Sequence, residues 1–164
     1  MERKASMAAV GAADARLLLL GSLPGDVSLA AQRYYAHPTN QFWRLLGVAI
    51  GEDLVDLHYD ARRARLAARG VALWDVVGEA VRPGSLDGAM RSVRHNALAE
   101  YIAEHSRLEA VGFNGKAAAA IGRRALGETQ LRLIDLPSSS AANTLRFEPK
   151  AERWRALAGF VDPA

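Results

Sequence analysis

The stretch Arg16-Leu17-Leu18-Leu19-Leu20-Gly21-Ser22-Leu23-Pro24-Gly25 passes directly from an apolar run into a turn-forming loop. A second stretch has the same form, because the run Leu131–Leu136 leads into Pro137-Ser138-Ser139-Ser140-Ala141-Ala142-Asn143. Short apolar runs without polar alternation are typical of strands that are buried on both faces of a parallel sheet. In open α/β sheets, ligands bind beyond the carboxyl ends of the strands. The two loops therefore predict one cleft, lined by hydroxyl and amide groups with few charges.

Two further apolar runs bring the number of expected strands to four. These runs are Val71–Val76 and Leu108–Phe113, and segments with helical spacing lie between the runs. The expected helices cover residues 40–50, 61–68, 96–105, 116–126 and 150–161. Strands that alternate with helices predict an α/β fold, a three-layer α/β/α sandwich around a central four-stranded parallel sheet.

The chain of 164 residues is long enough for one domain. We expect this domain to cover residues 15–164 and to follow a flexible N-terminal segment over residues 1–14. The segment Gly78–Ser92 is punctuated by glycine and proline, and it predicts a surface loop with a short helix from near Ser85. Its Arg82 and Arg91 could reach a phosphate backbone, although a solvated connection explains them equally simply.

Composition excludes several kinds of chemistry. The chain contains no cysteine, so disulfides, thiolate-bound clusters and a cysteine nucleophile are excluded. Its four histidines are scattered without metal-ligand spacing, and we expect neither a metal nor a cofactor. No apolar run approaches the ~20 residues that cross a bilayer, so we expect no membrane partner and a cytoplasmic location. The net charge of +3 comes with many arginines, which suit phosphate contacts but are also typical of GC-rich genomes.

The segment Tyr34-Tyr35-Ala36-His37-Pro38-Thr39-Asn40-Gln41-Phe42-Trp43 gathers aromatic rings, an imidazole and amides ahead of a helix. Asn40 has two interpretations. Its side chain can cap the following helix, or it can face the predicted cleft while Tyr35 stacks on a planar ligand. Phe42 and Trp43 fit the hydrophobic core better than the cleft.

Three motifs in this order and at this spacing resemble the uracil-DNA glycosylase superfamily: Gly-Ser-Leu-Pro-Gly, Tyr-Tyr-Ala-His-Pro-Thr-Asn-Gln-Phe-Trp-Arg, and Leu-Pro-Ser-Ser-Ser-Ala-Ala-Asn. Within the superfamily the chain is most similar to the hypoxanthine-DNA glycosylase branch, from about Leu17 to Trp154. The resemblance implies an enzyme that turns a damaged base out of DNA and hydrolyses its N-glycosidic bond. It also implies that the chain acts without a covalent lyase step.

The resemblance assigns roles to individual positions. It makes Asn40 the catalytic residue. The candidate base-binding residues are Ser22, Leu23, Gly25, Tyr35, His37 and Asp75. The candidate DNA-binding residues are Ser138, Ser139, Ser140, Ala142, Asn143, Asn114 and Lys116. Ala142, Asn143 and Leu145 are candidates for the wedge that fills the space vacated by the base. For Asp75 and for Asn114 with Lys116, an ordinary turn is an equally good explanation.

Two departures from the superfamily pattern bear on the mechanism. Many members carry a water-positioning Asp or Asn in the first loop, where this chain has Leu23, and uracil-specific members open the last motif with a His, where this chain has Leu136. An amide is not a useful general base, so Asn40 can only orient a water or offer its dipole to developing charge. The resemblance implies that hypoxanthine, the base of deoxyinosine, is the substrate, and the missing His argues against efficient removal of uracil by the His-assisted route.

Other functions remain open from the sequence. Uracil or a mismatched G:U or G:T pair is the first alternative substrate, since uracil offers the same adjacent C=O and N–H groups as hypoxanthine. A non-catalytic DNA-binding module and a small enzyme acting on free nucleosides are the further alternatives. The expected partner is damaged DNA, single- or double-stranded, bound by a monomer.

Overall fold

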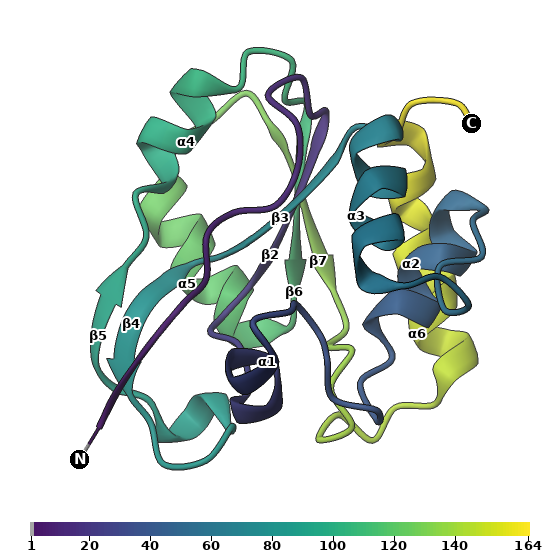
Figure 1. Ribbon diagram of the computed structural model, residues 1–164. Coiled ribbons are helices and arrows are strands. Elements are labelled where there is room, and N and C mark those ends of the chain that lie inside the picture. The colour runs from purple at the N-terminus through teal and green to yellow at the C-terminus, as the bar shows by residue number, and fades with distance from the viewer. Residues whose placement is uncertain (1) are drawn as a thin grey trace.

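The computed structural model describes residues 2–164 and confirms the predicted four-stranded parallel sheet. The strand order is β3 (Val71–Asp75), β2 (Leu17–Gly21), β6 (Ala110–Asn114), β7 (Arg132–Leu136). Helices α2 (Phe42–Ile50), α3 (Tyr59–Ala68) and α6 (Phe147–Trp154) cover one face of this sheet (Figure 1). Helices α4 (Leu98–Glu104) and α5 (Lys116–Leu126) cover the other face, which completes the three layers.

Strand β2 explains why an unbroken leucine run forms the centre of the sheet. Leu17 and Leu19 pack in the cluster that contains Phe42 and Trp154, whereas Leu18 and Leu20 pack in the opposite cluster with Phe113. Successive side chains of a strand point to opposite faces, and both faces of β2 are covered. All four leucines are consequently buried.

The position of the cleft follows from the connections of β2 and β6. After β2 the chain continues, through the short helix α1 (Asp26–Ala31), to the face of α2 and α3, and after β6 it continues to the opposite face through α5 (Figure 1). Two neighbouring parallel strands whose connections leave in opposite directions create a crevice at their carboxyl ends. This crevice lies beyond Gly21 and Asn114.

A second, antiparallel sheet corrects the prediction for residues 78–92. Strand β4 (Val77–Val81) follows β3 after one residue, and it pairs with β5 (Arg91–His95) to form a hairpin instead of a surface loop. A short 3-10 helix, η1 (Asp87–Ala89), lies between the two strands where the sequence predicts a helix from near Ser85. The sequence pattern missed β4 and β5 because β5 is exposed and the half-buried β4 is interrupted by Gly78 and Glu79, so neither carries an apolar run.

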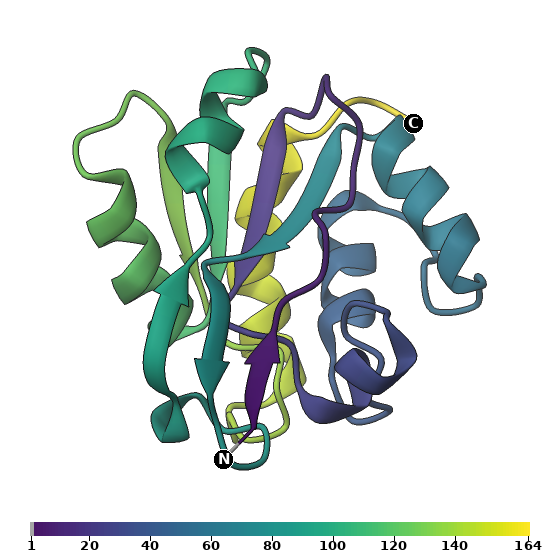
Figure 2. The same ribbon diagram turned by 60° about the vertical axis from the view of Figure 1, so that its left-hand side comes forward.

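The N-terminal segment also has more structure than the sequence suggests. Strand β1 (Arg3–Ala5) pairs antiparallel with β4, and Val10 forms a bridge with Leu73 at the edge of the large sheet. The segment therefore runs across the junction of the two sheets (Figure 2). The last expected helix, residues 150–161, begins earlier as α6 and ends as a 3-10 helix, η2 (Arg155–Phe160).

Packing between α5 and β6 generates a prediction about stability. A Cβ on Gly122 of α5 would lie 2.3 Å from Cε1 of Phe113, whose side chain is fully buried. Gly122→Ala should lower the free energy of unfolding by about 1–2 kcal/mol, because overpacking outweighs the ~1 kcal/mol gain in helix propensity. Chemical denaturation monitored by circular dichroism measures the change.

Gly159→Ala is the matched control, since no atom lies within 4 Å of its added Cβ. It should leave the stability unchanged within about 0.5 kcal/mol. A Gly122→Ala variant as stable as the wild type would contradict the packing described here.

Candidate active site

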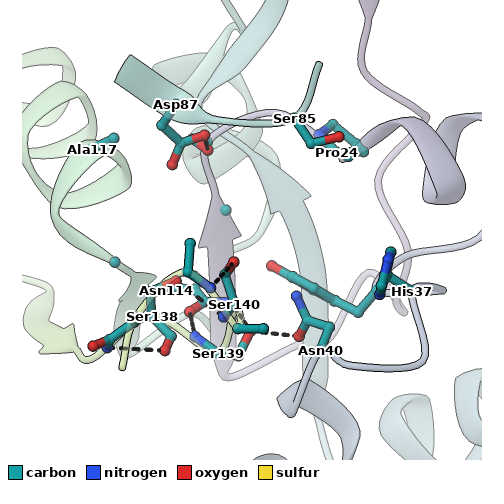
Figure 3. A pocket seen from close by; sticks show the side chains of 18 of the residues that line it. Pro24, His37, Asn40, Ser85, Asp87, Asn114, Ala117, Ser138, Ser139 and Ser140 are labelled. Atoms are coloured by element: carbon teal, nitrogen blue, oxygen red, sulfur yellow. Dashed lines mark hydrogen bonds between the residues drawn. The ribbon is translucent and has the colours of Figure 1, made fainter. Parts of the chain in front are cut away.

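One cleft of about 1210 Å³ opens at the carboxyl edge of the parallel sheet. It is bordered by the loops that follow β2, β6 and β7 and by the β4–β5 hairpin (Figure 3). The cleft brings together every site residue predicted from the sequence: Ser22, Leu23, Gly25, Tyr35, His37, Asn40, Asp75, Asn114, Lys116, Ser138, Ser139, Ser140, Ala142 and Asn143. The spatial grouping is therefore as expected, although several side chains have other partners than expected.

The carbonyl groups of the first loop, residues 21–24, face the start of β4 and the side chain of Arg82. Val76 and Val77 donate their backbone N–H groups to the carbonyls of Gly21 and Ser22, at 2.9 and 3.0 Å. The buried guanidinium of Arg82 donates to the carbonyls of the next two residues, at 3.2 and 2.6 Å. A trans peptide holds its C=O and the following N–H in opposite directions. The N–H groups of Ser22, Leu23 and Gly25 therefore point away from β4 and Arg82.

Asn40 is not the N-cap of α2, a position that Gln41 occupies, but its side chain contacts both the first residue of the helix and the cleft. Its Oδ1 accepts the N–H of Phe42 at 2.9 Å and the hydroxyl of Ser139 at 2.7 Å. A backbone N–H can only donate, so the oxygen of the amide must face Phe42, and the amide orientation is determined. The amino group then points into the cleft (Figure 3). The side chain thus fixes the start of α2 and still presents two N–H donors to a ligand.

Ser139 is the hub that holds Asn40 in place. It is fully buried, its N–H donates to Oδ1 of Asn114 at 2.9 Å, and its Oγ accepts from Nδ2 of the same residue at 2.9 Å. Its carbonyl accepts the N–H of Gln41 at 2.9 Å. This arrangement differs from the expected phosphate contacts of Ser139 and Asn114, because the polar groups of Ser139 are already paired inside the protein. The pair instead joins the ends of β6 and β7 to the segment of Asn40.

Lys150 is a residue that the sequence analysis did not connect with the site. Its side chain is buried beneath the loop after β7, and its ammonium donates at 3.0 Å both to the carbonyl of Asn143 and to Oε1 of Gln41. Burial lowers the pKa of Lys150. A buried cation that bonds carbonyl groups fixes the loop geometry from below. No sequence signal separates it from a solvated helix lysine.

Tyr35 is held in a strained position on the wall of the cleft. Its φ of 54° lies in the left-handed region, which is rare for a bulky residue and costs on the order of 1–3 kcal/mol. Its ring stacks on that of Phe42 at a centroid distance of 3.8 Å and an angle of 12°. Its buried hydroxyl has no hydrogen-bond partner among the described residues, and burial raises its pKa. Strain together with an unpaired buried hydroxyl is typical of a functional position.

Asp75 lies at the end of β3, and its carboxylate approaches Gly21. Its Oδ1 and the hydroxyl of Tyr35 are each 2.8 Å from the place where a Cβ on Gly21 would stand, so only glycine fits there. The hydroxyl of Ser6 donates to Oδ2 of Asp75 at 2.7 Å. Burial raises the pKa of Asp75 to about 7, and the Ser6 bond opposes part of this rise.

The remaining predicted residues line the outer part of the cleft. His37 is exposed, and its Nδ1 is 2.8 Å from the hydroxyl of Thr39. Lys116 is exposed at the first turn of α5, and Ala142 is exposed on the loop after β7. Asn143 donates its amide to the carbonyl of Ser138 at 3.2 Å and so stiffens that loop.

Two groups of the β4–β5 hairpin also contribute to the cleft. Asp87 accepts the hydroxyl of Ser22 at 2.6 Å, and the hydroxyl oxygen of Ser85 accepts the N–H of Asp26 at 3.0 Å. The sequence interpretation of Arg82 as a phosphate contact is wrong, because its side chain is buried and holds the first loop.

Within residues 2–164 no cluster of side chains is suited to a metal ion, and no helix is long and apolar enough to cross a membrane.

The fold and this cleft define a protein of the DNA glycosylase class, and comparison with known proteins gives the family. Residues 8–158 match the model of the Uracil DNA glycosylase superfamily, and the chain belongs to that superfamily. A solution NMR structure of a Methanosarcina acetivorans protein assigned to the uracil DNA glycosylases superimposes with a TM-score of 0.84. It has 34% sequence identity and covers 96% of this chain and 97% of its own.

Two curated relatives are more specific. The chain is 39% identical over 141 residues to a hypoxanthine DNA glycosylase of Methanosarcina barkeri, which covers 84% of this chain and 87% of the relative. It is 37% identical over 144 residues to the hypoxanthine DNA glycosylase of Methanosarcina acetivorans, with 86% and 89% covered. The resemblance identified from the three motifs is therefore confirmed.

The buried carboxyl of Asp75 predicts how stability depends on pH. Its folded pKa of about 7 lies above the unfolded value of ~3.9, so the folded state binds the proton more tightly. Stability should therefore fall as pH rises from about 4 to about 7, by at most about 4 kcal/mol. Asp75→Asn removes the titration and should flatten this part of the profile. Urea unfolding at several pH values measures it.

The exposed carboxyl of Asp60 provides a control, and Asp60→Asn should leave the profile as in the wild type. If the free energy of unfolding rose between pH 4 and pH 7 by the same amount in the wild type and in Asp75→Asn, the raised pKa of this buried carboxyl would be contradicted.

Proposed function

We propose that the protein is a monofunctional DNA glycosylase that removes deaminated bases from DNA, with hypoxanthine as the preferred base. The observation that carries this proposal is the amino group of Asn40, which is fixed through the hydrogen bonds of the amide oxygen and directed into the cleft. The family and the two curated relatives support the same reaction class. We further propose that the enzyme acts as a cytoplasmic monomer without a cofactor.

The amide of Asn40 determines the kind of catalysis. Because Oδ1 already accepts two hydrogen bonds, the side chain meets a ligand only as a donor. A donor cannot remove a proton from water, but it stabilises negative charge on a departing base. Cleavage of a glycosidic bond can proceed through an oxocarbenium-like sugar. In such a reaction Asn40 stabilises the leaving base, and water then adds to the sugar.

Base recognition follows from the groups around Gly21. The backbone N–H groups of Ser22, Leu23 and Gly25 are suited to the carbonyl of hypoxanthine, and Oδ1 of Asp75 accepts its neighbouring ring N–H. Adenine presents the opposite pattern and would leave buried polar groups unpaired, which discriminates strongly. The ring of Tyr35, backed by Phe42, supports the flat face of the base. Stacking of this kind contributes ~1–3 kcal/mol per base.

The outer groups hold the DNA backbone. Ser138, Ser140 and Asn143 on the loop after β7, and Lys116 at the start of α5, surround the mouth of the cleft. In this proposal Ser139 and Asn114 act indirectly, by fixing that loop. Residues 2–164 contain three lysines, and in this proposal none of them attacks the sugar: Lys4 is paired with Asp26 and bonded to the carbonyl of Gly84, Lys116 is exposed, and Lys150 is buried and bonded to carbonyl groups.

A panel of labelled oligonucleotides tests the function. Single and double strands with one inosine, uracil, xanthine or G:T pair are incubated with the protein and then treated with alkali, which cuts abasic sites. We expect cleavage at inosine first, and none without alkali. Cleavage only at uracil or at G:T would favour the mismatch-specific alternative. Binding without cleavage would indicate a DNA-binding module, and hydrolysis of free inosine alone would indicate a nucleosidase.

Asn40→Asp tests whether position 40 acts as a donor. The carboxylate keeps an oxygen for Phe42 and Ser139 but replaces the amino group with a second acceptor. We expect excision of hypoxanthine in single-turnover assays to fall about 100-fold or more, as for loss of one preorganised donor, while the melting temperature stays near that of the wild type.

Asn40→Ala serves as the comparison, since it removes the donor and the acceptor together. It should be equally inactive and about 1 kcal/mol less stable, because the hydrogen bonds that Oδ1 accepts from Phe42 and Ser139 are lost. An Asn40→Asp variant with wild-type activity would show that position 40 acts as an acceptor, and the donor mechanism would be rejected.

A further inference from the structure

Leu86, at the tip of the β4–β5 hairpin, is the most exposed large apolar side chain among the described residues. It is 64% exposed and lines the mouth of the cleft. Six large hydrophobic residues of the described chain are exposed, and three of them, Val27, Leu86 and Leu145, border this one cleft. Exposed apolar residues that gather around a binding site indicate a contact with the ligand.

The hairpin tip is held firmly, so this exposure is not that of a loose loop. Arg82 bonds the carbonyl of Gly84 at 2.9 Å and the first loop at 2.6 Å, while Lys4 donates to the same Gly84 carbonyl at 2.6 Å. The residues on either side of Leu86 are also bonded, since Ser85 accepts from Asp26 and Asp87 accepts from Ser22. Leu86 therefore projects from a rigid frame that is joined to the loop expected to contact the base.

The location of the tip places Leu86 across the cleft from the loop after β7. Ser85 and Asp87 lie on one side of the cleft, and Ser138, Ser139 and Ser140 lie on the opposite side (Figure 3). The loop after β7 carries the wedge candidates named from the sequence, and of these Leu145 is 44% exposed. A nucleotide that enters the cleft thus passes between two apolar side chains from different parts of the fold.

The charges around the hairpin suit a polyanion. Strands β1 and β5 contribute the cations Arg3, Lys4, Arg91 and Arg94. Glu79 pairs with two of them, at 3.5 and 2.8 Å, and Asp26 pairs with Lys4 at 2.6 Å. The carboxylates next to the tip are thereby neutralised or hydrogen bonded, and the exposed Arg91 is available for a phosphate. An apolar tip flanked by cations fits duplex DNA, whose bases are apolar and whose backbone is charged.

We propose that Leu86 inserts into the DNA duplex beside the extruded nucleotide and fills part of the vacated space. This inference rests on the proposed function, in which the base leaves the helix. Turning a base out costs a few kcal/mol of stacking and pairing, and an apolar wedge between base steps offsets part of that cost. A single strand has no opposing base and no gap to fill. Leu86 should consequently matter for duplex substrates and not for single strands.

Excision of hypoxanthine from matched single- and double-stranded inosine substrates tests this role. We expect Leu86→Ala to lower the single-turnover rate on the duplex about tenfold, as loss of buried apolar surface implies, and to leave the rate on the single strand unchanged. Leu86→Met should retain most of the duplex activity. Val55→Ala, at a position that is 50% exposed and remote from the cleft, is the control and should affect neither substrate.

An unchanged duplex rate in Leu86→Ala, or an equal loss on single and double strands, would overturn the proposal. These outcomes differ from failure of the proposed function, in which the wild-type protein excises hypoxanthine from neither substrate. Because Leu86 is exposed, we expect the variant to fold like the wild type, and a melting curve verifies this.

Discussion

The hydrogen bond between the hydroxyl of Ser139 and Oδ1 of Asn40 is the contact on which the site depends. It joins two loops that are 99 residues apart in the sequence and fixes which end of the amide faces the cleft. Ser139 in turn is held by Asn114 at the end of β6. One buried serine thus ties the ends of β6 and β7 to the residue whose amino group faces the cleft. The direction of the Asn40 amino group is therefore a property of the fold, not of a mobile side chain.

Two buried cations that do not line the cleft hold the loops that form it. Arg82 bonds the carbonyls of the first loop, and Lys150 bonds those of the last loop, so each loop is fixed by a charge that does not enter the cleft. Each cation is costly to bury, and burial lowers the pKa of both. Carbonyls turned toward the cations leave N–H groups on the other side of the first loop. The arrangement creates a surface of donors, which suits the carbonyl of a base and the oxygens of phosphates.

The sequence predicted the parallel sheet well and the site contacts only in part. The four apolar runs became strands because both faces of the sheet are buried, which leaves a clear signal at Leu17–Leu20. Strands β1, β4 and β5 were missed because an exposed three-stranded sheet produces no such signal. Ser139 could not be distinguished from Ser138 and Ser140, since burial of one residue in a run of three depends on its partners elsewhere. Arg82 was misread for the same reason, because an arginine in a Gly-Pro segment is usually solvated.

Leu23 contributes no polar side chain to the cleft. Its side chain is 5% exposed and packs in the core, and its carbonyl is bonded by Arg82. At this position the loop can offer a ligand only its backbone, because an apolar side chain cannot position a water. In the proposed mechanism the polar side chain comes from another segment, where Phe42 and Ser139 hold Asn40 with its amino group unbonded. An amino group that only donates can stabilise a departing base but cannot take a proton from water, so in the proposed mechanism the donor at position 40 complements a first loop that offers only its backbone at position 23.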